Sequence, residues 1–249
     1  MSNKVEQVKT FFNQTELYLK IDFNIRIRTE VVQGFVGNQT FASILDIGCG
    51  NGAISLPLLR RCNHLTLLDV SSNMLSIARS NIPPELEENV KTINGDFMQA
   101  TWQPRSFDLM LCLGVLAHVD SPEDVIAKMV YLLKPGGSII VQNSDMQHPF
   151  SHLLNFYSKI RRAPVWAPYT LNRLSSAALE EKFRHHRLDQ IATYRYNLSV
   201  PGMARILNNA RAYTFIKKVY GPYTNNYGSR LGSECIYHLR KPDSPGEHG

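Results

Sequence analysis

The sequence LDIGCGNG at residues 45–52 decides the fold. A short apolar strand predicted at residues 43–47 contains one acid, Asp46, and is followed by three glycines at alternate positions. Glycine allows backbone conformations that other residues resist, and it lets the main chain approach a ligand closely. A carboxylate at position 46 would repel a pyrophosphate but suits a ligand with an amino group and a positive centre. The octet therefore predicts a strand that ends in a ligand-binding turn.

Strand and helix patterns alternate around this octet, from Ser43 to Asn143. Such alternation predicts an α/β fold with a doubly wound, mostly parallel sheet and right-handed crossovers. The Ser121-Pro122 pair should begin a helix, with Asp124 completing a capping box. Seven strands are predicted, at residues 43–47, 65–69, 90–94, 107–113, 138–143, 188–196 and 234–240. Helices are predicted at 53–61, with a kink at Pro57, at 72–80 and at 122–133. Residues 134–137 should form a turn.

The segments outside this core should be helical insertions. Apolar residues at helical spacing predict a helix over Pro201–Tyr220, begun by Pro201 and ended by Gly221-Pro222. We expect one domain over residues 1–240, in which 1–40 form an N-terminal helical cap and 43–143 form the ligand-binding core. Residues 148–187 and 197–233 should form a second helical cap, and 241–249 a flexible tail.

Composition excludes several classes of protein. With 43% hydrophobic residues among 249, a packed core is expected and global disorder is not. The four cysteines match no zinc or disulfide framework, so we expect buried thiols and no metal. Neither a signal peptide nor a membrane-spanning run is visible, which predicts a cytoplasmic protein.

Charge is unevenly distributed along the chain. Residues 1–158 hold 12 basic and 15 acidic residues, whereas residues 159–240 hold 14 basic and 4 acidic ones. A one-sided basic region suits an acidic substrate, an anionic membrane surface or a nucleic acid, or it is simply a solvated face.

The strand ends carry the chemistry, because open α/β sheets bind ligands there. Asp69 ends the second strand about 20 residues after the octet, where an acid typically holds ribose hydroxyls. Gly95-Asp96-Phe97 follows the third strand. A nicotinamide dinucleotide is the competing ligand, since Gly48, Gly50 and Ala53 fit its fingerprint, but Asp46 and the acid–aromatic pair favour S-adenosylmethionine.

These motifs, together with His118-Val119-Asp120-Ser121-Pro122 and Leu133-Lys134-Pro135-Gly136-Gly137, resemble a class I S-adenosylmethionine-dependent methyltransferase. The nearest likeness is to the small-molecule group typified by ubiquinone and menaquinone biosynthesis methyltransferases, and it covers about Ser43 to Asn143. It implies a Rossmann-like fold and S-adenosylmethionine as cofactor. The resemblance implies that Asp46, Gly48, Gly50 and Gly52 contact the methionine part of the cofactor, and that Asp69 binds the ribose. Met74, Asp96 and Phe97 would contact the adenine. The Leu113 backbone would meet the amino group, and an N-terminal Tyr18 or Arg28 would pair with the carboxylate.

Methyl transfer needs a base only if the acceptor must lose a proton. His118, after the fourth strand, is the first candidate, and it competes with a purely structural role in its loop. His148 and His152 are weaker candidates, and Asp145 could orient a substrate.

The acceptor is expected to be a small molecule. The second half of the chain is rich in arginine and aromatic residues, which suits a hydrophobic or aromatic metabolite that could carry a carboxylate or phosphate. Oxygen is the first choice of acceptor atom, then nitrogen or carbon. Contact with a membrane surface is less favoured. Three alternatives remain: an RNA methyltransferase that uses the basic half, a cofactor-binding protein without methyl transfer, and an NAD-binding oxidoreductase. We expect no obligatory nucleic acid partner.

Overall fold

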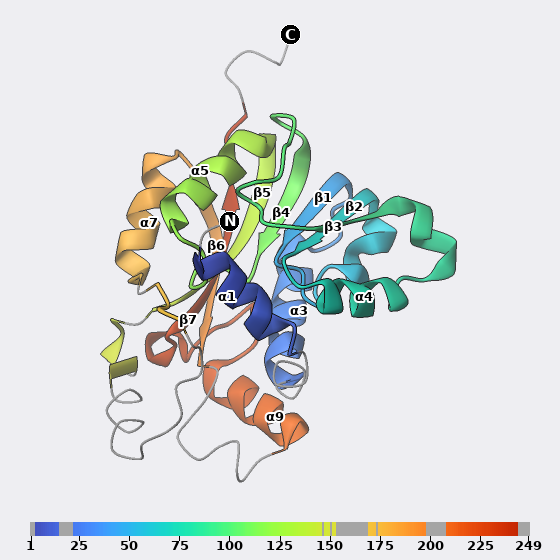
Figure 1. Ribbon diagram of the computed structural model, residues 1–249. Coiled ribbons are helices and arrows are strands. Elements are labelled where there is room, and N and C mark those ends of the chain that lie inside the picture. Colours follow the sequence, from blue (N-terminus) through green and yellow to red (C-terminus); the bar gives the residue numbers. More distant parts are fainter. Residues whose placement is uncertain are drawn as a thin grey trace.

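Seven strands form one sheet in the order β3-β2-β1-β4-β5-β7-β6 (Figure 1). The computed structural model describes residues 3–14, 22–145, 147–149, 151–152, 169–172, 174–197 and 208–243. The strands are β1 (Phe41–Ile47), β2 (Cys62–Asp69), β3 (Val90–Asn94), β4 (Phe107–Cys112), β5 (Leu133–Ser144), β6 (Asp189–Tyr196) and β7 (Glu234–Arg240). The predicted doubly wound, mostly parallel sheet of seven strands is confirmed.

Helices cover both faces of this sheet. They are α1 (Asn3–Phe12), α3 (Asp22–Val36), α4 (Ser72–Ser80), α5 (Pro122–Leu132), α7 (Ser176–His185) and α9 (Asn209–Tyr220), with short 3₁₀ helices η1 (Leu56–Arg61), η2 (Pro84–Asn89) and η3 (Ser229–Leu231). Apolar residues of α3, α4 and α9 share one buried cluster, and those of α5 and α7 share another. Figure 1 shows α5 and α7 on one side of the sheet and α4 and α9 on the other.

The parallel part of the sheet is built from strands that are buried on both faces. In β1 and β4 the side chains of Ile44, Leu45, Leu109 and Leu111 are fully buried, which suits continuous apolar runs. Parallel pairing in register brings the carboxyl ends of β1, β2, β3, β4 and β5 to one edge. That edge is where the octet lies.

The last strand inserts between its neighbours. β7 pairs antiparallel with both β5 and β6, and Ser144 of β5 faces Glu234 of β7 across the ladder. An acid near the chain's end is thereby placed at the same edge of the sheet as the carboxyl end of β5.

Three predicted elements need correction. Residues 53–61 do not form an α-helix: turns lead into the 3₁₀ helix η1, because Pro57 near its start denies a backbone donor. Residues 134–137 belong to β5, where Gly136 at φ +70° accompanies a register shift against β4, so the predicted turn is a strand irregularity. Helix α9 begins after the N-cap Asn208, later than Pro201, while residues 198–207 lie outside the described residues.

Other boundaries agree closely. The predicted helix at 72–80 and the strands at 90–94 and 234–240 are found with the same bounds. Ser121 caps α5 by accepting a hydrogen bond from the Asp124 amide. The four cysteines are buried and free, as expected.

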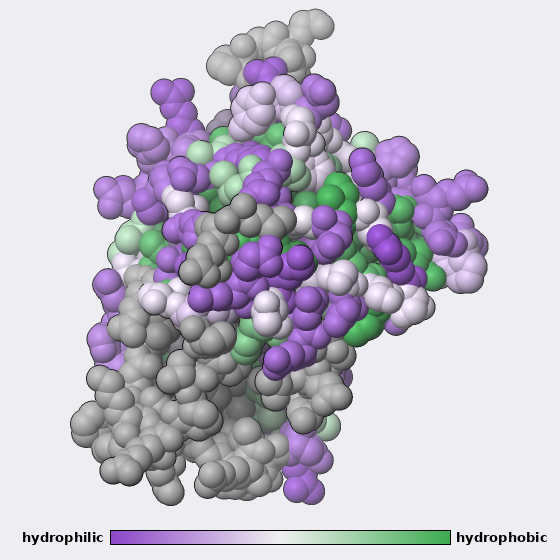
Figure 2. Space-filling model, viewed as in Figure 1, coloured by the Kyte–Doolittle hydropathy of each residue, from purple (hydrophilic) through white to green (hydrophobic). Residues whose placement is uncertain are grey.

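The surface is mainly polar over the described residues. Figure 2 shows hydrophilic side chains across most of the visible face that is not grey, with apolar ones in small areas between them. In the part of the chain that the structure describes, no helix has the length and apolar character needed to cross a membrane.

Candidate active site

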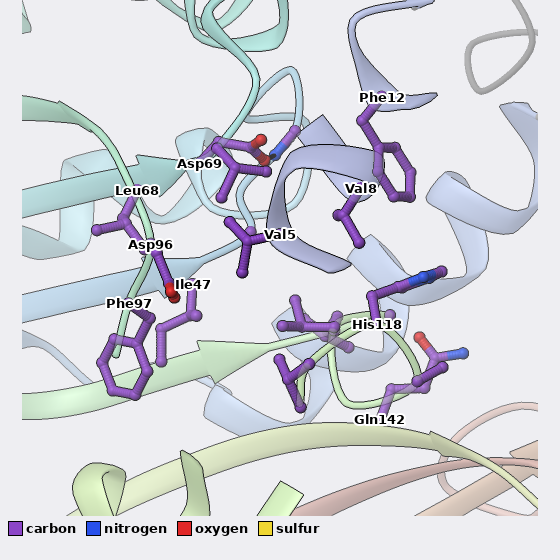
Figure 3. A pocket seen from close by; sticks show the side chains of 18 of the residues that line it. Val5, Val8, Phe12, Ile47, Leu68, Asp69, Asp96, Phe97, His118 and Gln142 are labelled. Carbon is purple, nitrogen blue, oxygen red and sulfur yellow. Dashed lines mark hydrogen bonds between the residues drawn. The ribbon is translucent and has the colours of Figure 1, made fainter. Parts of the chain in front are cut away.

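A cavity of about 560 Å³ lies at the carboxyl ends of the parallel strands. Its lining comes from the ends of strands β1, β2 and β5, from the start of β7, from the loops that follow β3 and β4, and from helices α1 and α3. Figure 3 shows Asp69, Asp96 and Phe97 toward one end and His118 and Gln142 toward the other. A volume of this size is typical of a small-molecule site.

The glycine turn shapes the floor of the cavity. Gly48 and Gly50 both line it and adopt positive φ angles of 67° and 55°. A β-carbon at Gly48 would lie 2.5 Å from Val115 Cγ2, so the loop after β4 can approach only a glycine there. Gly52, which was expected in the same cradle, is not among the lining residues, because it turns toward Leu56 and Ala78.

Asp69 is held rigidly beside this turn. Its Oδ2 accepts a hydrogen bond from the Gly50 amide at 2.8 Å, and its Oδ1 accepts one from the Ser71 amide at 2.8 Å. Burial raises the pKa of Asp69, and the two amide hydrogen bonds oppose that change. A buried carboxylate that lines the cavity and is fixed by backbone amides is suited to accept hydrogen bonds from a diol.

Asp46 lies behind the turn rather than on the cavity wall. Burial raises its pKa to about 7; the nearby Ser55 hydroxyl opposes this and Asp69 adds to it. Its Oδ2 is buried and has no hydrogen-bond partner within the described residues.

The residues expected near adenine lie together. Met74, Asp96 and Phe97 all line the cavity, and Met74 is buried. Asp96 Oδ1 accepts a hydrogen bond from the Met98 amide at 2.9 Å. Lys128 Nζ donates to the Phe97 carbonyl oxygen at 2.8 Å and so holds the loop after β3.

Helix α1 covers the cavity. Its Val5, Val8 and Phe12 side chains point into the space (Figure 3). Lys4 Nζ donates to the Val119 carbonyl oxygen at 2.7 Å, in the loop after β4. At the other end, Asn13 Oδ1 accepts from the Ser71 hydroxyl at 2.7 Å, next to β2. The segment that contains α1 is therefore anchored to loops on both sides of the cavity.

His118 lines the cavity opposite the adenine end. Its Nδ1 lies 2.9 Å from the Tyr169 hydroxyl, and Phe12 packs edge-on to its ring at 5.3 Å. Burial lowers the pKa of His118 to about 4, and the charges of Lys4 and Arg28 add to this. The ring is consequently neutral near pH 7 and keeps one nitrogen able to accept a proton, although its basicity is low.

The other candidates are placed differently. His148 is not a lining residue; its Nε2 lies 3.0 Å from the Arg230 carbonyl oxygen. Asp145 is buried and bonds the amides of Gln147 and Ser176, which is a structural role. Arg28 and Leu113 line the cavity, whereas Tyr18 lies outside the described residues.

A buried polar cluster was missed by sequence reasoning. Asn24, Gln142, Ser144 and Glu234 line the cavity beside Arg28. These residues come from α3, β5 and β7, so no short motif links them, and only the strand order brings them together.

Residues 45–141 match the family model described as "Methyltransferase domain". Over these residues the chain is therefore similar to methyltransferase domains, as the sequence resemblance predicted. The matched residues run from the octet to β5, which is nearly the span on which the sequence resemblance rested. The nicotinamide alternative is thereby set aside.

Part of this chain is also similar in sequence to curated proteins. Residues of this chain are 32% identical to a ubiquinone biosynthesis O-methyltransferase from Xylella fastidiosa over 105 residues, which cover 40% of the chain and 41% of that protein. The chain spans about half or less of the length of the curated relatives that it matches at 30% identity or more.

Solved structures share the fold. One is a possible histamine N-methyltransferase from Thermotoga maritima, with a TM-score of 0.65, 18% identity, and coverage of 94% of this chain and 99% of that one. Another is a magnesium protoporphyrin IX methyltransferase from Synechocystis with bound S-adenosylhomocysteine, with a TM-score of 0.63, 16% identity, and coverage of 96% and 100%.

The cavity fits the cofactor of this methyltransferase domain. It offers fixed carboxylates at Asp69 and Asp96, the apolar side chains of Met74 and Leu113, and a main-chain turn open to close approach. Asp46 provides a buried oxygen without a partner within the described residues, which suits a ligand with a positive centre. Within the same residues, no group of three or more His, Cys, Asp or Glu side chains is placed to hold a metal ion.

Proposed function

We propose that this chain transfers a methyl group from S-adenosylmethionine to a small, hydrophobic or aromatic acceptor molecule, with oxygen as the acceptor atom. The observation that carries the proposal is a single covered cavity that has Asp69 and Asp96 at one end and His118 at the other. One space could hold the donor and the acceptor in contact. The name of the Xylella fastidiosa relative, an O-methyltransferase, supports the choice of oxygen.

The lining favours an acceptor with a large apolar part. Val5, Val8, Phe11 and Phe12 of helix α1 form an apolar roof over the cavity. An aromatic or aliphatic acceptor would bury its surface against this roof, and each buried CH₂ contributes about 0.8 kcal/mol. The same roof keeps water away from the reacting atoms.

When bound, S-adenosylmethionine supplies a methyl group that its sulfonium has already activated. The residues of this chain then have two tasks, which are to align the acceptor oxygen and to receive its proton. Alignment contributes most, because positioning two reactants can lower a barrier by roughly 7–11 kcal/mol.

His118 is the proposed proton acceptor. For the ring to act through Nε2, Nδ1 must carry its proton and donate to the Tyr169 oxygen, which lies 2.9 Å away. Tyr169 would then be a positioning residue. A base with a pKa of about 4 is weak, so its contribution should fall at the lower end of the usual range, about 10²-fold.

Two measurements test this function. Calorimetry should detect binding of S-adenosylhomocysteine to the purified chain, and incubation with isotopically labelled S-adenosylmethionine should transfer the label to a hydroxylated aromatic acceptor in a metabolite screen. Binding without transfer to any acceptor would favour a protein that only holds the cofactor. An affinity for RNA below micromolar with strong salt dependence would favour the RNA alternative.

A further inference from the structure

Glu234 is the centre of a polar cluster at the end of the cavity away from Asp96. Its Oε2 accepts hydrogen bonds from Gln142 Nε2 at 2.8 Å and from the Ser144 hydroxyl at 2.8 Å. All three residues line the cavity. Close by, the Tyr196 hydroxyl donates to Asn24 Oδ1 at 2.7 Å and lies 3.5 Å from Gln142 Nε2. The strand pairing of β5 with β7 fixes this arrangement, since Ser144 and Glu234 are register partners.

Gln142 has an unused acceptor in this cluster. The side chain is only 2% exposed, and its Oε1 is buried without a hydrogen-bond partner within the described residues. The other atom of the amide, Nε2, faces Glu234 and donates to its Oε2. A buried acceptor without a donor lowers the stability of the folded protein, and a ligand that supplies the donor restores it. Such atoms in a cavity wall indicate a missing ligand group.

The charges of the cluster indicate which group is missing. Burial raises the pKa of Glu234, while the Ser144 hydroxyl, Arg28 and Gln142 oppose the change. Arg28 is the one cation among the five described residues of this polar wall, and its guanidinium lies against Gly114 after β4. A carboxylate or phosphate in this place would meet both Glu234 and the Gln142 oxygen. A hydroxyl or an amino group would instead donate to them.

We propose that Gln142 and Glu234 bind a hydrogen-bond donor of the acceptor molecule, a hydroxyl or an amino group, and thereby select against anionic acceptors. This rests on the proposed function, since it assigns the second end of the same cavity to the acceptor. It also narrows the expectation from sequence, in which the acceptor could carry a carboxylate or phosphate. An acceptor molecule without such a donor would leave Gln142 Oε1 and Glu234 without a hydrogen bond to the ligand, and it would therefore bind more weakly.

The experiment compares four small probes on the complex with S-adenosylhomocysteine. Phenol and benzylamine each carry a donor, anisole carries only an acceptor, and benzoate carries a negative charge. Ligand-observed NMR at millimolar probe concentration should show phenol or benzylamine binding about tenfold more tightly than anisole and benzoate, as expected for one hydrogen bond in a buried site. Preference for phenol identifies a hydroxyl, and preference for benzylamine identifies an amine.

Variants connect the preference to the cluster. Gln142→Met keeps the volume but removes the unused oxygen, so the ratio of donor to anisole affinity should fall to about one. The matched control is Gln103→Met, which makes the same change at an exposed loop residue and should keep the tenfold ratio. Glu234→Gln preserves the shape and should reduce benzylamine binding more than phenol binding.

Several results would overturn the proposal. They are an unchanged ratio in Gln142→Met, benzoate as the tightest probe, equal binding of phenol and anisole, or no binding of any probe. Each is measured on a complex already formed with S-adenosylhomocysteine. If the wild-type chain fails to bind S-adenosylhomocysteine, the proposed function is wrong; if it binds and the probes show no donor preference, only this inference is wrong. A Gln142→Met protein that does not bind S-adenosylhomocysteine is replaced by Glu234→Gln.

Discussion

The two ends of the cavity are built in different ways. At the Asp69 end, the wall is made by residues 48 to 97, and main-chain groups hold the key carboxylate. At the Glu234 end, the wall joins Asn24, Gln142 and Glu234, and side chains bond to side chains. Hydrogen bonds from main-chain amides do not depend on which side chains the donor residues carry. Hydrogen bonds between side chains change with each substitution, which suits the end of the cavity that is proposed to bind the acceptor.

The largest effect is expected at the Asp69 end. Asp69→Ala leaves the Gly50 and Ser71 amides without their acceptor and removes the contact proposed for the ribose. Affinity for S-adenosylhomocysteine should fall at least about 100-fold, as expected when buried donors lose a charged partner. Calorimetry measures this, with Asp189→Ala at an exposed strand position as the control. Unchanged affinity would show that Asp69 does not contact the cofactor.

The second largest effect is expected at His118, which lies at the end of the cavity opposite Asp69 and Asp96. His118→Ala should reduce turnover by about 10²-fold while affinity for S-adenosylhomocysteine changes little. Tyr169→Phe should give a smaller loss, since the ring stays but its tautomer is no longer fixed. His148→Ala, outside the cavity lining, should retain full turnover. Steady-state rates with a labelled methyl donor check this order, and full activity in His118→Ala would remove it as the base.

The pH dependence of cofactor binding tests Asp46. Its raised folded-state pKa of about 7 means that the ionised form, which attracts the protonated amino group of the ligand, forms only as pH rises through that value. Affinity for S-adenosylhomocysteine should therefore increase by about tenfold between roughly pH 6 and pH 8. Asp46→Asn should flatten this dependence. In the free protein the same raised pKa has the opposite effect on folding. The contribution of Asp46 to the free energy of unfolding should fall as pH rises from about 4 to about 7, so the melting temperature should decrease over this range.

The smallest effects concern the roof, which spans both ends. Asn13→Ala loses the bond to Ser71, and Lys4→Met loses the bond to the Val119 carbonyl oxygen. One hydrogen bond is worth about 1 kcal/mol, so each should raise the dissociation rate of S-adenosylhomocysteine by about fivefold. Stopped-flow displacement measures the rate. Equal rates in both variants and the wild-type chain would show that α1 does not retain the cofactor.

Much of the fold could be read from local patterns. The octet, the capped helix at Ser121 and the apolar strands predicted the sheet because each signal lies within a few residues. The errors arose where a local signal had two outcomes. Pro57 was compatible with a kinked α-helix or a 3₁₀ helix, and Gly136 with a turn or a strand irregularity. Packing against neighbouring strands made those choices.

The sequence by itself determined the Asp69 end of the cavity, which is the proposed cofactor site. Gly48, Asp69, Asp96 and Phe97 follow successive strands, and parallel strands place their carboxyl ends at one edge. The tertiary structure alone decided the other end. It put β7 between β5 and β6 and set Glu234 against Gln142 and Ser144. It also left Asp46 and His148 out of the cavity lining. Three hydrogen bonds of this cluster join residues 90 to 172 positions apart, so no short spacing in the sequence predicts them. They depend instead on the order in which the strands pair.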